Sequence, residues 1–133
     1  MLFRSVSDIV LDSDSIRQVF LNLLANAIKF GKDGSEIKVS ISSARLNSQG
    51  NEKEAIRVSV FDQGLGIPES ELKSIFDKFT QSTRTRTGAG GTGLGLPICL
   101  EIVERHAGEI WAENVAQGGA VFHVVLPIEG PGV

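Results

Sequence analysis

Three polar side chains near the start of the chain recur at helical spacing. Asn22, Asn26 and Lys29 are four and three residues apart, so they share one side of a helix, and we expect that side to lie opposite the helix's apolar stripe. Amide oxygens and an ammonium group are suited to binding Mg²⁺ and the phosphates that it bridges. An ordinary solvated helix face is the alternative, and for this row alone it is the favoured interpretation.

An aspartate and two glycines follow directly on a strand-like stretch, in the sequence Asp62-Gln63-Gly64-Leu65-Gly66-Ile67. A carboxylate at a strand end can accept a hydrogen bond from an exocyclic amino group such as that of adenine, and glycines let the backbone approach a flat ring closely. A plain turn between a strand and a helix is the alternative, because glycine and aspartate are common turn residues.

A glycine-rich segment covers residues 88–96 and leads into a helical pattern. Backbone amides at a helix N-terminus point outward with the positive end of the helix dipole, so this segment can bind phosphates. The Gly-Lys-Ser/Thr ending of a Walker loop is absent, and a flexible hinge is an equally good interpretation of the segment alone. Residues 80–92, in which Ala89 is the only apolar residue, are predicted to form a mobile loop.

Three helices are predicted around these segments. Apolar residues at helical spacing indicate a helix over residues 15–30, with Ser15 and Gln18 as a capping box, and another over residues 94–107. A shorter helix is expected after Pro68. Its apolar stripe would consist of Leu72, Ile75, Phe76 and Phe79.

Alternating apolar residues indicate four strands, over residues 36–44, 56–60, 109–113 and 120–126. The first two are predicted to pair as a hairpin, with the polar residues 45–54 as its exposed connection. The element order is helix, two strands, two helices, two strands. It favours an α/β fold, a two-layer sandwich with three helices over a mixed, largely antiparallel sheet.

The 133-residue chain is the size of one domain, and we expect a single domain over residues 1–133. Its net charge is -3 and no cluster of lysine or arginine stands out, which argues against nucleic-acid binding. Cys99 is the only cysteine, so an internal disulfide is excluded and a reducing, cytoplasmic location fits best. Every apolar window is shorter than a membrane span, so direct membrane contact is not expected, and an anchor of a membrane-bound parent would lie outside this sequence.

Taken in order, the polar and glycine-rich segments resemble the sequence boxes of the histidine kinase ATP-binding domain, whose superfamily includes gyrase, MutL and a heat-shock chaperone. Residues 22–30 resemble the N box, residues 62–67 the G1 box, residues 76–79 the F box and residues 91–96 the G2 box. Residues 103–111 and 122–127 also resemble the family's closing helix and strands. Four boxes in the right order outweigh the ordinary interpretation of each one.

The resemblance implies that the chain binds ATP together with Mg²⁺. Asp62 would bind the adenine amino group and Lys29 a phosphate, while Asn26 would coordinate Mg²⁺ with help from Asn22. The other residues implied in nucleotide binding are Phe30, Gly64, Gly66, Ile67, Phe79, Gly91, Thr92, Gly93, Leu94, Gly95 and Leu96.

Residues 80–92 would then be the ATP lid, which closes over the triphosphate. Arg84 and Arg86 are candidates for lid contacts with phosphate or with a partner domain. The hydrolysing relatives in this superfamily carry glutamate at the place of Asn22, and an amide cannot act as a base. Slow hydrolysis is therefore expected.

Neither His106 nor His123 lies in the acid-flanked setting of the family's phospho-accepting histidine, and neither is expected to be phosphorylated. The acceptor would lie on a separate dimerisation domain, with residues 1–12 as a lead-in from it. The implied reaction is Mg²⁺-assisted in-line transfer of the γ-phosphoryl group to Nε2 of that histidine, and a response regulator receiver domain would act downstream. The chain alone is expected to be a monomer.

Two alternative functions remain open from the sequence. One is a nucleotide-binding sensor or scaffold module without transfer activity, and the four intact boxes argue against it. The other is an anti-sigma-factor-type serine kinase, which uses a similar pocket on a protein substrate. Asn22 and the Gly-Thr-Gly-Leu-Gly-Leu sequence favour a histidine kinase over this second alternative.

Overall fold

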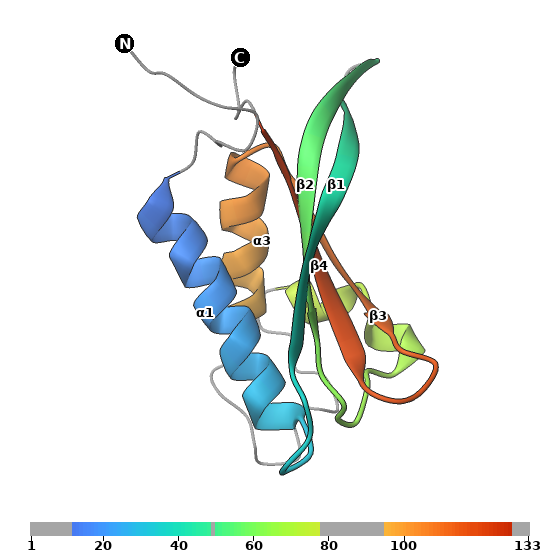
Figure 1. The fold of residues 1–133 in the computed structure, drawn as a ribbon. Helices are drawn as coiled ribbons and strands as arrows, with labels where there is room; N and C mark the ends of the chain where they lie inside the picture. Colours follow the sequence, from blue (N-terminus) through green and yellow to red (C-terminus); the bar gives the residue numbers. More distant parts are fainter. Residues whose placement is uncertain (1–11, 49, 78–94, 129–133) are drawn as a thin grey trace.

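The structure is a computed structural model that describes residues 12–48, 50–77 and 95–128. In chain order the elements are α1 Ser13–Phe30, β1 Lys38–Ser48, β2 Asn51–Phe61, η1 Glu69–Glu71, η2 Ser74–Phe76, α3 Gly95–Arg105, β3 Glu109–Asn114 and β4 Ala120–Pro127. Helices α1 and α3 lie side by side on one face of a four-stranded sheet (Figure 1). The predicted two-layer α/β sandwich is confirmed, with two α-helices in place of three among the described residues.

The strands lie in the order β1-β2-β4-β3, and each of the three pairings between them is antiparallel. The prediction of a largely antiparallel sheet is confirmed, whereas the parallel pairing of a mixed sheet does not occur among the described strands. β4 lies between β2 and β3 and is buried at all of its positions. Because its side chains alternate between the two faces, β4 supplies apolar groups to both sides of the sheet.

Helix α1 begins two residues earlier than predicted, because its N-cap is Asp12 and not the proposed Ser15–Gln18 capping box. The Asp12 carboxylate accepts hydrogen bonds from the backbone amide of Ser15 (3.4 Å) and from its hydroxyl (2.9 Å), and these bonds lower the pKa of Asp12. The buried stripe of the helix consists of Ile16, Val19, Leu23, Ala27 and Phe30. No helix in the described part of the chain is long and apolar enough to cross a membrane.

The predicted helix after Pro68 is instead two short 3₁₀ turns, η1 and η2. The hydroxyl of Ser74 donates to the carbonyl of Glu71 (3.4 Å), so a side chain takes an acceptor that a continuous helix would pair with a backbone amide. Ile75 and Phe76 are still buried, as their apolar character requires. The ring of Phe76 meets that of Phe122 edge to face, at 6.3 Å between centroids.

Helix α3 is close to its predicted position and packs against α1. The buried thiol of Cys99 faces the carbonyl of Val19 at 3.7 Å, and burial raises the pKa of this thiol to about 11. At the end of α3, Nδ1 of His106 donates to the carbonyl of Ile102 (2.8 Å), and Nε2 accepts from the backbone amide of Asp12 (3.1 Å). His106 is therefore a buried side chain that links α3 to the start of α1.

The predicted connection over residues 45–54 is wrong, because most of it belongs to strands. β1 and β2 pair from Lys38↔Phe61 to Ser48↔Asn51, and only a tight turn containing Gly50, at φ +80°, joins them. Polar composition suggested a loop, but one apolar position holds the outer part of this ribbon in place. Leu46 is buried and packs in a small cluster with Ala55 and Val125 on the face opposite the helices.

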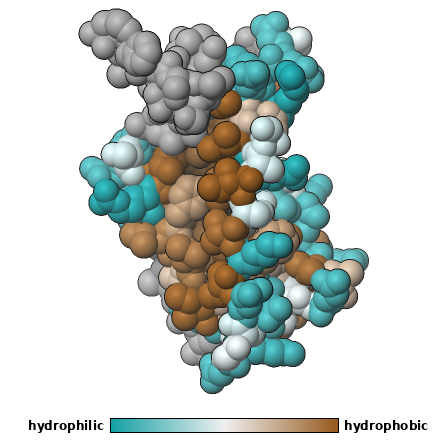
Figure 2. Space-filling model, viewed as in Figure 1, coloured by the Kyte–Doolittle hydropathy of each residue, from teal (hydrophilic) through white to brown (hydrophobic). Residues whose placement is uncertain are grey.

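The helix layer covers the sheet only in part. Helix α1 packs over β2, and Val39 and Ile41 on the helix side of β1 remain exposed. Leu21 and Ile28 of α1 are exposed as well. Figure 2 shows a band of apolar surface between α1 and the β1–β2 ribbon. Leu21 and Ile28 therefore give this flank of α1 an apolar surface.

His123 lies on the face of the sheet opposite the helices and is 9% exposed. Its Nδ1 is 2.6 Å from the hydroxyl of Ser59, and its Nε2 is 3.5 Å from the carboxylate of Glu113. The Trp111 ring stacks against it at 5.0 Å, and Phe61 meets it edge to face. Burial lowers the pKa of His123 below its usual 6.5; Glu113 raises it and Arg57 lowers it further.

This lowered pKa predicts a loss of stability on acidification. Because the unfolded chain takes up a proton on His123 at a higher pH than the folded protein, the contribution is complete above pH 6.5 and declines as the pH falls below it. The difference in unfolding free energy between pH 7.5 and pH 5.5, measured by urea denaturation, should be smaller in His123→Gln than in the unsubstituted protein. Equal differences in the two proteins would contradict this account.

Candidate functional site

Asp62 directly follows the end of β2, and the residue is 2% exposed. Its Oδ1 accepts hydrogen bonds from the backbone amides of Gly64 (2.9 Å) and Ala120 (3.3 Å). Its own backbone amide donates to the carbonyl of Ala120 (2.9 Å). The carboxylate is therefore held in one orientation at the point where the strand gives way to the glycine-containing loop. A buried carboxylate fixed in this way is a built acceptor for a hydrogen-bond donor.

The loop over residues 62–67 passes directly over the C-terminal end of α1. A methyl group on Gly64 would overlap the carbonyl oxygen of Phe30, so only glycine allows this approach. Gly66 has a φ of +74°, which other residues rarely adopt. The backbone geometry therefore requires glycine at both of these predicted site residues. The close contact between Gly64 and Phe30 also brings the end of the predicted N box next to the predicted G1 box.

The β3–β4 hairpin holds both ends of this loop. At the far end, Oδ1 of Asn114 accepts from the backbone amide of Ile67 (2.7 Å), and Nδ2 of Asn114 donates to the carbonyl of the same residue (2.6 Å). At the near end, Ala120 pairs with Asp62 as described above. Sequence reasoning missed Asn114. Its partner lies 47 residues away, so no local spacing could have revealed the contact.

Gly119 was missed for the same reason. Its φ is +91°, and a methyl group there would overlap the carbonyl oxygen of Asp62. The turn is closed by hydrogen bonds from Val115 N to Gly119 O (3.0 Å) and from Gly118 N to Val115 O (2.9 Å). The only available signal was the Gly118-Gly119 pair, which is typical of a turn but does not indicate that the turn contacts the loop.

The polar row of α1 does not lie opposite the apolar stripe, as was predicted, but on the flank that faces α3. Nδ2 of Asn22 donates to the carbonyl of Gly95 at the start of α3 (3.2 Å), and Oδ1 of Asn22 accepts from Gln18 (2.9 Å). Nδ2 of Asn26 is buried and has no hydrogen-bond partner among the described residues. Lys29 is exposed. At one end of the row, Asn22 therefore links α1 to α3. At its centre, the amide nitrogen of Asn26 is unsatisfied among the described residues.

Part of the predicted site falls outside the described residues. Gly95 opens α3, and Leu96 behind it packs against the core. Other predicted residues lie in the undescribed segment over residues 78–94, and so does the predicted lid over residues 80–92. They are Phe79, Arg84, Arg86, Gly91, Thr92, Gly93 and Leu94.

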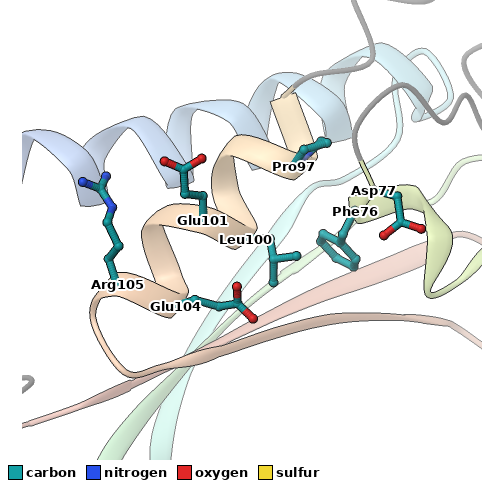
Figure 3. Close-up of a pocket in the computed structure, with 7 residues that line it drawn as sticks. All are labelled: Phe76, Asp77, Pro97, Leu100, Glu101, Glu104 and Arg105. Carbon is teal, nitrogen blue, oxygen red and sulfur yellow. The ribbon is translucent and has the colours of Figure 1, made fainter.

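A separate cavity of about 460 Å³ lies between η2 and α3 (Figure 3). Its apolar walls are Phe76, Pro97 and Leu100, and its charged lining residues are Asp77, Glu101, Glu104 and Arg105. Three carboxylates against one guanidinium make this rim unfavourable for a polyphosphate. The nucleotide site predicted from the sequence is centred instead on the loop over residues 62–67, called the Asp62 loop below. The residues of this loop do not line the cavity.

The fold, the fixed carboxylate and the glycine loop against α1 agree with one family of ATPases. Residues 11–130 match the family described as "Histidine kinase-, DNA gyrase B-, and HSP90-like ATPase". The chain therefore belongs to this ATP-binding family, and the resemblance found in its sequence boxes is confirmed.

Within that family, similar proteins include sensor histidine kinases. The chain is 38% identical over 118 residues to sensor histidine kinase WalK of Bacillus subtilis, which covers 88% of this chain and 18% of that protein. It is 39% identical over 125 residues to adaptive-response sensory kinase SasA of Crocosphaera subtropica, covering 94% of this chain and 31% of that protein. The chain thus spans about a fifth to a third of the length of these relatives.

Two solved structures extend the comparison to the fold. A mycobacterial sensor histidine kinase, MprB, aligns with a TM-score of 0.75 at 27% identity, over 92% of this chain and 76% of that one. The catalytic domain of histidine kinase ThkA, in a nucleotide-free form, aligns with a TM-score of 0.68 at 32% identity, over 91% of this chain and 71% of that one. The chain corresponds to the ATP-binding catalytic domain of such kinases.

Proposed function

We propose that this chain transfers the γ-phosphoryl group of ATP to a histidine on a separate dimerisation domain of a longer sensor kinase. The observation that carries the proposal is the buried Asp62 carboxylate, held by the amides of Gly64 and Ala120 at a strand end. A carboxylate in this setting can accept a hydrogen bond from the adenine amino group. Membership of an ATP-binding family supports adenine as the base.

The remaining nucleotide contacts follow from the arrangement around Asp62. Gly64 and Gly66 let the loop backbone lie against the base, while the buried Phe30 and Ile67 form the floor beneath it. In this proposal Lys29, at the exposed end of α1, reaches the phosphates. The other proposed contacts are Phe79, Gly91, Thr92, Gly93, Leu94, Gly95 and Leu96, with residues 80–92 as the lid of a single domain over residues 1–133.

Asn26 is the described residue that best fits a magnesium ion and its phosphates. Its buried amide nitrogen has no hydrogen-bond partner within the described part of the chain, and a half-turn of the amide would present the oxygen at the same place. Asn22 fits less well, because both ends of its amide are engaged by Gln18 and Gly95. The described residues contain no group of three His, Cys, Asp or Glu side chains that could hold a metal. Asn26 would hold the Mg²⁺ ion, which would supply positive charge to offset the negative charge that develops on the phosphates during transfer.

In the proposed reaction, Nε2 of the acceptor histidine forms a bond to the γ-phosphorus while the bond from that phosphorus to the ADP oxygen breaks. The contribution of this chain is to bind and orient ATP. Asn22 cannot take a proton from water, because it is an amide and serves as a tie between α1 and α3. This favours transfer over hydrolysis. The phosphoryl group would then pass to a response regulator receiver domain, and we place the reaction in the cytoplasm, where ATP is available.

Binding of an unreactive ATP analogue, titrated with and without Mg²⁺, tests the first part of this proposal. We expect Mg²⁺ to strengthen binding, and Asn26→Ala to remove about tenfold or more of that gain. Asn47→Ala is the matched control, since Asn47 is an exposed asparagine of β1. Binding by the unsubstituted protein that ignores Mg²⁺, or an Asn26→Ala variant with full enhancement, would remove Asn26 from the site.

Transfer is tested by adding labelled ATP and the segment of the parent protein that carries the dimerisation domain. Acid-labile label on a histidine of that segment is the expected result. Nucleotide binding without transfer would favour a sensor or scaffold module. Acid-stable label on a serine of a protein substrate would favour the anti-sigma-factor type of kinase.

A further inference from the structure

One side chain, that of Asn114, holds the C-terminal end of the Asp62 loop at Ile67. Asn114 is the last residue of β3, and its amide makes two hydrogen bonds, of 2.7 Å and 2.6 Å, to the backbone amide and carbonyl of Ile67. Asn114 itself is exposed, whereas Ile67 is 4% exposed. An exposed side chain contributes little to core packing, so these two bonds are its main role.

Asn114 and Ala120 are direct partners across the β3–β4 ladder. Ala120 holds the near end of the loop through both its amide and its carbonyl, and Asn114 holds the far end. One cross-strand pair therefore sets the distance between the two ends of the loop. In the middle of the loop, the backbone amide of Gly64 donates to the Asp62 carboxylate, and the side chain of Gln63 accepts from the backbone amide of Glu36 (3.1 Å).

We infer that Asn114 is a positioning residue for the nucleobase, an inference that rests on the proposed function. By fixing Ile67 it holds the Gly64–Gly66 backbone against the base, so that the base presents its amino group to the Asp62 carboxylate. Asn114 touches neither the base nor the reacting atoms. Its loss leaves Asp62 held by Ala120 and frees the opposite end of the loop.

The test compares ATP with ITP, in which a carbonyl oxygen replaces the adenine amino group. The unsubstituted protein should bind ATP more tightly than ITP, because ITP lacks the donor for Asp62. Asn114→Ala should weaken ATP binding by about tenfold. It should weaken ITP binding much less, so the preference for ATP falls. A residue that only adds stability to the whole domain would lower the melting temperature without changing this preference.

Asn114→Asp provides a second variant that differs little in size. It keeps an acceptor for the Ile67 amide but turns an oxygen toward the Ile67 carbonyl, so we expect the same loss of preference. Asn47→Ala and Asn47→Asp are the matched controls and should bind like the unsubstituted protein. Folded Asn114 variants with an unchanged ATP-to-ITP preference would overturn the inference. No ATP binding by the unsubstituted protein would overturn the proposed function, and the inference with it.

Discussion

Asp62→Asn should weaken binding of an ATP analogue roughly 10- to 100-fold, the range expected for a lost hydrogen bond to a charged group. The substitution preserves the size of the side chain, and its remaining oxygen can still accept from Gly64 and Ala120. Its new amino group would then face the amino group of adenine, donor against donor. Calorimetric titration measures the loss directly.

The control for this prediction is Asp14→Asn, which removes the same charge from an exposed position in the first turn of α1. It should bind the analogue as the unsubstituted protein does. Thermal unfolding without nucleotide shows whether the Asp62 variant is folded. A folded Asp62→Asn protein with full affinity would mean that the base is recognised elsewhere.

Gly119→Ala should be among the most destabilising single substitutions in the hairpin. The added methyl group would overlap the carbonyl oxygen of Asp62, and the φ of +91° is unfavourable for alanine. Backbone strain and overpacking together predict a loss of at least about 3 kcal/mol in the free energy of unfolding. Urea denaturation measures this loss. The folded fraction should also bind the ATP analogue less tightly, because the strain falls on the residue that anchors the base.

The neighbouring glycine separates the two causes. Gly118 has a φ of +112°, but a methyl group there would meet nothing within 4 Å. Gly118→Ala should therefore lose only about 1 to 2 kcal/mol through backbone strain and leave nucleotide binding unchanged. Equal losses in the two variants would show that the turn conformation, and not its contact with Asp62, is what requires glycine.

Much of the fold could be predicted because its elements carry clear local periodicity. The apolar spacing of residues 15–30 and 94–107 identified α1 and α3 to within two residues, since each helix buries one continuous stripe. The connection predicted between the first two strands was wrong for reasons of tertiary context. Residues 45–54 are polar yet extend β1 and β2, because pairing and the burial of Leu46 override their loop-like composition.

The same distinction between local sequence signals and tertiary context applies to the residues of the candidate site. Asp62, Gly64 and Asn26 were predicted because each lies in a short motif whose chemistry is visible without a partner. Asn114 and Gly119 act on residues that are distant in the sequence, and their own surroundings carry no sign of it. The hydrogen bond from Asn22 to the carbonyl of Gly95 could not be predicted either, because it depends on how α1 and α3 pack against each other.

β4, one of the two inner strands of the sheet, is the last described element of the chain. β1 and β2 can pair with each other as soon as both have been made, but β4 must enter between β2 and β3 before either face of the sheet has a complete core. On a ribosome, a nascent chain that has released only α1, β1 and β2 therefore exposes apolar groups that have no partner. The core can therefore be completed only after Ala120–Pro127 has emerged from the exit tunnel, even though the β1–β2 hairpin can pair earlier.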